Sequence, residues 1–125
     1  MRRLYLSLIA VIAALHCYIA WFEIFAWTSR GPAIFGTLPP EIFVQTTQLA
    51  ANQGVYNAFL AAGLIWSLLI ADRMWQRRIA VCFLTFVLIA GVAAAMTIAL
   101  RSGLFQMVPA ALALIFIAAE RRAAH

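Results

Sequence analysis

Long apolar runs separated by short polar breaks constrain this chain more than any other feature. Hydrophobic residues make up 66% of its 125 residues and charged residues only 10%, whereas soluble domains carry about 25% charged residues. A chain of this composition cannot cover itself with a polar surface. We therefore expect an all-α membrane protein with a single domain over residues 1–125.

The breaks predict four membrane-spanning helices in an up-down bundle. A span needs about 20 apolar residues, and the runs that meet this length cover approximately residues 4–27, 49–71, 79–100 and 104–119. The first run resembles a secretory signal, but it continues too far for a cleaved leader. Residues 28–48 form a long first external loop, in which Gly31-Pro32 is expected to stop a helix and Pro40 to begin a short one. Arg101-Ser102-Gly103 reads as a tight turn.

The positions of the arginines predict which way the bundle lies. All nine basic residues are arginine, and cytoplasmic loops of membrane proteins are enriched in basic residues. With alternating spans, Arg30 and Arg101 fall on one side, and seven arginines fall on the other: Arg2, Arg3, Arg73, Arg77, Arg78, Arg121 and Arg122. This places both termini in the cytoplasm and the chain in a cytoplasmic (inner) membrane. Because the arginines bound apolar runs, they indicate topology and headgroup contacts rather than nucleic-acid binding.

The second apolar run has an unusual polar side. Asn52, Gln53, Tyr56 and Asn57 fall within an arc of roughly 140° on a helix, beside an arc of small residues that includes Gly54. Carboxamides cost free energy in lipid unless they are hydrogen-bonded. These four side chains are therefore candidate ligand-binding residues, although Asn52 and Gln53 could also cap the helix or hold the loop.

The first apolar run carries His16 and Glu23, which lie on one face because they are seven residues apart. Ionisable residues inside spans are usually functional. With alternating spans, His16, Glu23, Trp27 and the amides of the second run share the outer half of the membrane, as does Gln106 at the start of the fourth span. We expect one polar pocket there, with Gln106 and Trp27 as further ligand-binding candidates.

A histidine and a carboxylate in one pocket can perform general acid–base chemistry. His16 and Glu23 are thus hypothetical catalytic residues, although either could serve only packing or an interface. The two cannot by themselves complete a metal site, which takes three or four ligands, so neither a metal nor another cofactor is expected. Cys17 and Cys82 lie within apolar runs, which argues against a disulfide or a redox motif.

Two stretches of the sequence resemble a known family. HCYIAWFEIFAW at 16–27 and AANQGVYNAFLAAGLIW at 50–66 are similar to the bacterial small integral membrane proteins of domain of unknown function 1304. The shared positions include His16, Glu23, Trp27 and the Asn-Gln-Gly-x-Tyr-Asn pattern that begins at residue 52. The resemblance implies a four-helix membrane protein and brings no activity with it.

Three functions remain open from the sequence. The pocket could bind, or act on, a small apolar or lipid-like molecule; Glu23 could carry protons in a small exporter; or the polar groups could fix helix register in an accessory membrane protein. The expected partners are the lipid bilayer, a small apolar ligand and a second copy of the chain, but not nucleic acid.

Overall fold

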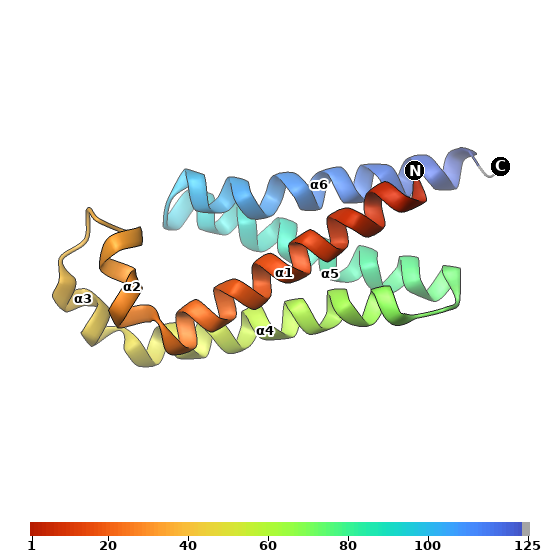
Figure 1. The fold of residues 1–125 in the computed structure, drawn as a ribbon. Helices are drawn as coiled ribbons and strands as arrows, with labels where there is room; N and C mark the ends of the chain where they lie inside the picture. Colours follow the sequence, from red (N-terminus) through yellow and green to blue (C-terminus); the bar gives the residue numbers. More distant parts are fainter. Residues whose placement is uncertain (124–125) are drawn as a thin grey trace. The chain divides into compact units, whose positions relative to one another are not determined.

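The long apolar runs form helices, and no strand occurs in the part of the chain described by the structure, residues 1–123 of a computed structural model (Figure 1). The two last residues of the predicted domain lie outside this range. The helices are α1 (Arg2–Phe25), α2 (Trp27–Ile34), α3 (Pro40–Gln45), α4 (Thr47–Leu69), α5 (Arg73–Thr97) and α6 (Leu100–Ala123). The prediction of an all-helical chain is confirmed.

Three helices in the described part are long and apolar enough to cross a membrane: Arg2–Phe25, Arg73–Thr97 and Leu100–Arg122. The chain is therefore consistent with a membrane protein. Helix α4 is 23 residues long and has no charged residue, but Asn52, Gln53 and Asn57 lower its hydropathy. The four-span bundle accordingly remains a prediction, and its uncertain member is the helix with the polar side.

The chain forms two compact units, and helices α1 and α4 each contribute to both. The first unit consists of Met1–Ala13 and the chain from Ala62 onward; the second consists of Ala14–Ala61. Each unit carries one free, exposed cysteine, Cys82 in the first and Cys17 in the second.

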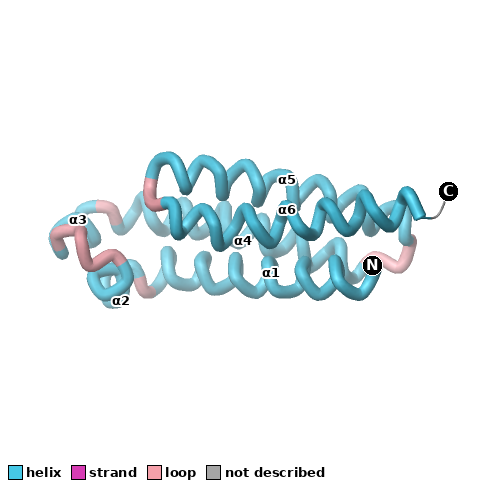
Figure 2. The backbone as a smooth tube through the Cα atoms, turned by 90° about the horizontal axis from the view of Figure 1, so that it is seen from above, coloured by secondary structure: helices cyan, strands magenta, loops and turns pink. Residues whose placement is uncertain are grey.

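In the first unit, α5 and α6 are antiparallel neighbours (Figures 1 and 2). The buried residues of α5 recur every three or four positions, from Gln76 through Ala80, Leu84 and Val87 to Gly91, as one face of a helix requires. Large apolar side chains such as Phe86 and Ile115 remain exposed. In a membrane protein, such side chains can face lipid.

The turn between α5 and α6 lies earlier than the sequence suggested. Helix α6 already begins at Leu100, so Arg101, Ser102 and Gly103 belong to its first turn and are not a tight turn. A Cβ atom at position 103 would overlap the carbonyl oxygen of Gly91 and atoms of Ala95. Membrane helices commonly associate through close contact between small residues. Here such a contact joins the first turn of α6 to α5, so the two helices are packed together close to the turn that connects them.

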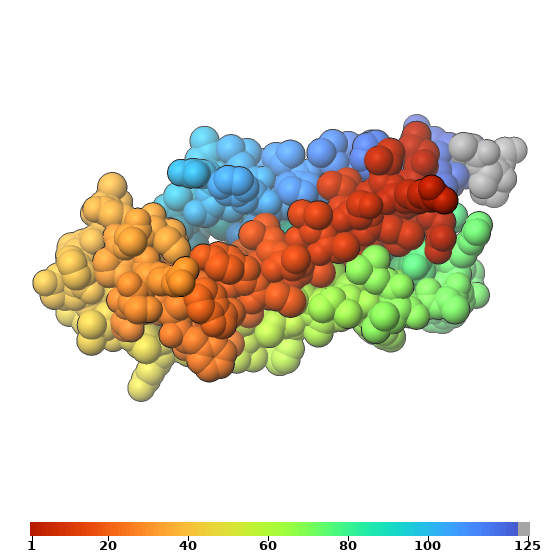
Figure 3. Space-filling view, viewed as in Figure 1, coloured from red at the N-terminus to blue at the C-terminus, as the bar shows by residue number. Residues whose placement is uncertain are grey.

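In the second unit, the segment predicted as a long loop contains two short helices, α2 and α3. They pack against each other, and their atoms touch on the face shown in Figure 3. Helix α2 continues through Gly31-Pro32, contrary to the predicted stop. Inside a helix, proline removes one backbone donor, and its ring conflicts with the carbonyl four residues earlier and with the N–H and Cβ of the preceding residue. Glycine at position 31 removes the Cβ part of this conflict, and the helix continues to Ile34.

The start of α3 agrees with the sequence. Pro40 is its first residue and follows an extended Pro39, because a proline at this position loses no helical hydrogen bond. The helix ends at Gln45, and α4 begins two residues later at Thr47. The backbone thus bends at Thr46 before the long helix begins.

We predict that Gly103→Ala destabilises the α5–α6 hairpin by about 1–3 kcal/mol, because overpacking a tight contact costs that much. Gly36→Ala is a matched control, since the nearest atom to its new Cβ would be the Pro32 carbonyl oxygen at 3.9 Å. Unfolding of both variants in detergent, followed by circular dichroism, would measure the difference. Equal stability of the two variants would contradict the close contact.

Candidate functional site

Glu23 and Asn57 form the central pair of the candidate site. Glu23 lies in the last turn of α1 and is half-buried, whereas Asn57 lies in α4 and is only 8% exposed. The amide nitrogen Nδ2 of Asn57 donates to Oε2 of Glu23 at 2.8 Å and to the backbone carbonyl oxygen of Gln53 at 3.3 Å. A carboxylate and a carboxamide from two long helices therefore meet directly.

Gly54 allows the two helices to come close enough for this bond. A Cβ atom at position 54 would lie 2.6 Å from Cγ1 of Ile24, 3.0 Å from the carbonyl oxygen of Ala20 and 3.1 Å from Cβ of Glu23. Only glycine leaves room for the α1 backbone at this point. Because Asn57 is three residues later on the same helix face, this contact presents its amide to Glu23.

The other predicted side chains of α4 point elsewhere. Asn52, Gln53 and Tyr56 are exposed, and the Tyr56 ring packs edge-to-face on Phe59 with centroids 6.2 Å apart. Of the four residues in the polar arc, Asn57 alone is buried. The two exposed amides both precede Asn57 along α4, and their part in ligand binding remains a prediction.

His16 and Trp27 lie on either side of Glu23 along the chain. His16 is fully buried and lies two helical turns before Glu23, about 10 Å along the axis. Trp27 is the first residue of α2, and its indole Nε1 donates to the hydroxyl of Thr46 at 3.0 Å. Trp27 is thus committed to a structural contact, and its ring faces α3.

An aromatic cluster surrounds Trp27 and was not expected from the sequence. The Trp27 ring lies 5.5 Å from Phe22, 6.0 Å from Phe35 and 5.2 Å from Phe43 between centroids, distances typical of favourable aromatic pairs. The cluster fastens α2 and α3 to the end of α1. The four aromatic residues of this cluster all lie in the segment 22–43, which could have indicated it. Helical periodicity could not predict their contacts, because the segment is divided among three helices.

Gln106 belongs to the first unit. Its Cβ lies against Gly91 of α5, 3.1 Å from the position that a Cβ on Gly91 would take, and it is half-buried in α6. Its assignment to the same pocket as Glu23 remains a prediction.

The pair of Glu23 and Asn57 has a defined chemical capacity. In the described part of the chain, the Glu23 carboxylate takes part in one hydrogen bond, through Oε2, so Oε1 can accept a further one from a hydroxyl or amine. The same part of the chain contains no cluster of three His, Cys, Asp or Glu residues that could hold a metal ion. The arrangement is suited to holding one polar group of an otherwise apolar molecule.

Comparison with known proteins identifies a family but no activity. The model of a family described as "Protein of unknown function (DUF1304)" matches residues 10–118. No curated protein and no solved structure matches the chain. The matched range includes both partners of the Glu23–Asn57 hydrogen bond.

We predict an energetic coupling between Glu23 and Asn57. Hydrogen bonds between membrane helices contribute about 0.6 kcal/mol on average and up to about 1.7 kcal/mol, and a bond to a carboxylate should fall in the upper part of this range. A double-mutant cycle with Glu23→Ala and Asn57→Ala, each of which removes one partner of the bond, measured by unfolding in detergent, would give the coupling energy. Strictly additive effects would show that the pair contributes nothing to stability.

Proposed function

We propose that this chain, which belongs to the DUF1304 family, is an integral membrane protein that binds a small apolar or lipid-like molecule through Glu23. One observation carries this proposal: within residues 1–123, the Glu23 carboxylate is held by Asn57 at 2.8 Å through one of its two oxygens. An ionisable group in an apolar helix costs free energy and is usually retained for a function. The hydrogen bond fixes its orientation and leaves an acceptor for a ligand.

The neighbouring polar groups suit such a ligand. Gln53 and Asn52 are exposed on the helix that carries Asn57, so they can donate to or accept from the polar end of a bound molecule. The apolar surface of α1 and α4 would hold the rest of it. If the molecule is also converted, Glu23 and His16 are the groups able to act as acid and base.

The proposed placement is the cytoplasmic membrane, crossed by α1, α4, α5 and α6, with both termini inside. Seven arginines at one end of the spans and two at the other support this orientation. The Glu23 site would then open toward the outer half of the membrane, next to the segment that contains α2 and α3.

A structural or accessory role is the second candidate, and a specific observation favours it. Asn57 donates both to Glu23 and to the Gln53 carbonyl, so the two amide hydrogens are used within the protein. A network of this kind fixes the register of two helices even when it binds no ligand. The third candidate, an exporter with Glu23 as proton carrier, predicts proton release when its substrate is added.

We predict that the purified protein retains a lipid-like molecule and that Glu23→Gln reduces this retention at least tenfold, because a neutral amide is a weaker acceptor than a carboxylate. Mass spectrometry of organic extracts from equal amounts of protein would measure it. Glu41→Gln is the matched control, since Glu41 is exposed in the first turn of the short helix α3.

Different outcomes separate the candidates. Retention that is lost in Glu23→Gln and kept in Glu41→Gln supports the ligand site. Folded protein that retains nothing in any form contradicts the ligand site and favours the accessory role. Proton release on substrate addition that disappears in Glu23→Gln would identify the exporter.

A further inference from the structure

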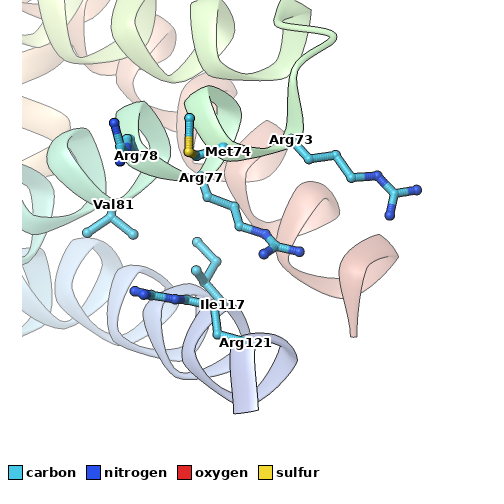
Figure 4. Close-up of a pocket in the computed structure, with 7 residues that line it drawn as sticks. All are labelled: Arg73, Met74, Arg77, Arg78, Val81, Ile117 and Arg121. Carbon is cyan, nitrogen blue, oxygen red and sulfur yellow. The ribbon is translucent and has the colours of Figure 1, made fainter. Parts of the chain in front are cut away.

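A hollow in the first unit is independent of the Glu23 site and is lined mainly by arginine. It lies between the first half of α5 and the last turns of α6, and it has a volume of about 580 Å³. Figure 4 shows Arg77 of α5 extending toward α6 and Ile117 of α6 extending toward α5, whereas Arg73 extends away from them. The lining residues are Arg73, Met74, Arg77, Arg78, Val81, Ile117 and Arg121.

The positive charge of this arginine pocket exceeds the negative charge near it. The Glu120 carboxylate pairs with Nη2 of Arg77 at 2.9 Å, and it is the acid that neutralises a lining arginine in the described part of the chain. Asp72 is engaged elsewhere, since its Oδ1 accepts from the backbone nitrogen of Trp75 and caps α5 at 2.8 Å. With both carboxylates counted, four guanidinium groups still stand against two acids, so the surroundings of the pocket carry a net positive charge that attracts anions.

Two arginines of the pocket, Arg78 and Arg77, have defined surroundings. Arg78 lies over the Trp75 ring, 5.3 Å from its centroid, which restricts its side chain at the pocket wall. The Nε atom of Arg77 is buried and has no hydrogen-bond partner among residues 1–123. A topology signal requires neither a concave surface nor arginines from two helices in its lining.

The apolar part of the lining favours an anion that also carries apolar groups. Met74, Val81 and Ile117 form the remaining wall, and a second, shallower hollow on α6 is lined by Ile115, Ala118, Ala119 and Arg122. Each hollow thus combines apolar side chains with arginine at the end of the helix. A phospholipid matches this combination, because its negatively charged phosphate lies next to apolar acyl chains.

We infer that the arginine pocket binds the phosphate group of an anionic phospholipid. Guanidinium groups bind phosphate through two parallel hydrogen bonds, and basic pockets between membrane helices commonly hold lipid headgroups. Arg78 and Arg121 contact the phosphate from α5 and α6, while Met74, Val81 and Ile117 contact the first carbons of the acyl chains. The bound lipid links the two helices at the end where their arginines would otherwise repel each other.

The experiment measures binding of defined lipids to the full chain in neutral detergent by native mass spectrometry. Phosphatidylglycerol is expected to bind at least tenfold more tightly than phosphatidylcholine. One arginine near a membrane surface contributes about a fivefold change in affinity for an anionic lipid, so Arg78→Gln and Arg121→Gln should each weaken binding by about that factor. Arg121→Lys should restore part of the loss, because it keeps the charge without the paired hydrogen bonds.

Arg101→Gln is the matched control, since Arg101 lies in the first turn of α6 with its guanidinium over the Phe105 ring. This variant should bind phosphatidylglycerol like the wild type. Competition by millimolar inorganic phosphate alone would support the phosphate chemistry and assign the pocket to a free anion. Equal binding of both lipids, or an equal loss in Arg101→Gln and Arg121→Gln, would overturn the inference. Each variant is checked for folding by circular dichroism first.

Discussion

Polar groups in apolar helices must find their partners within the protein, because the interior of a membrane offers them no water. Several hydroxyl groups of the long helices meet this need locally: Ser67, Thr85 and Thr97 each donate to a carbonyl oxygen of their own helix. Asn57 is different, because it also donates to a carboxylate on another helix. A side chain that bonds across helices holds two elements in register, whereas a hydroxyl bonded to its own helix holds none.

The second unit depends on two such links. The Glu23–Asn57 bond joins α1 to α4, and the bond between the Trp27 indole and the Thr46 hydroxyl joins the start of α2 to the bend before α4. The aromatic cluster around Trp27 surrounds the second link with apolar rings. Together these links hold a segment with three prolines and several bends in one arrangement beside the Glu23–Asn57 pair.

The helices could be predicted from the sequence because their apolar runs are long and their ends carry charged residues. The wrong predictions concern positions where glycine or proline was taken as a signal for a helix end or a turn. Gly31-Pro32 was expected to stop a helix, but a glycine before proline has no Cβ to clash with the proline ring, and α2 continues past it. Gly103 was expected in a turn, but its contact with Gly91 and Ala95 makes it part of the packed hairpin. Local sequence carries no information about the surface that a residue will meet.

The candidate site could be predicted only in part for the same reason. Helical periodicity placed Asn52, Gln53, Tyr56 and Asn57 on one arc, but it could not give the rotation of that arc toward α1. The rotation follows from Gly54, where the backbones approach, and it turns Asn57 inward while Tyr56 stays exposed. The arginine pocket was interpreted as a set of topology signals because its residues come from two helices about 40 positions apart in the sequence.

The two cysteines give the molecule a built-in pair of attachment points. One exposed thiol lies in each compact unit, so spin labels at Cys17 and Cys82 need no engineered position. Pulsed dipolar spectroscopy on the labelled protein in nanodiscs would then record how the separation of the two units varies across the population. The same label pair would reveal any rearrangement between the units when lipid composition changes.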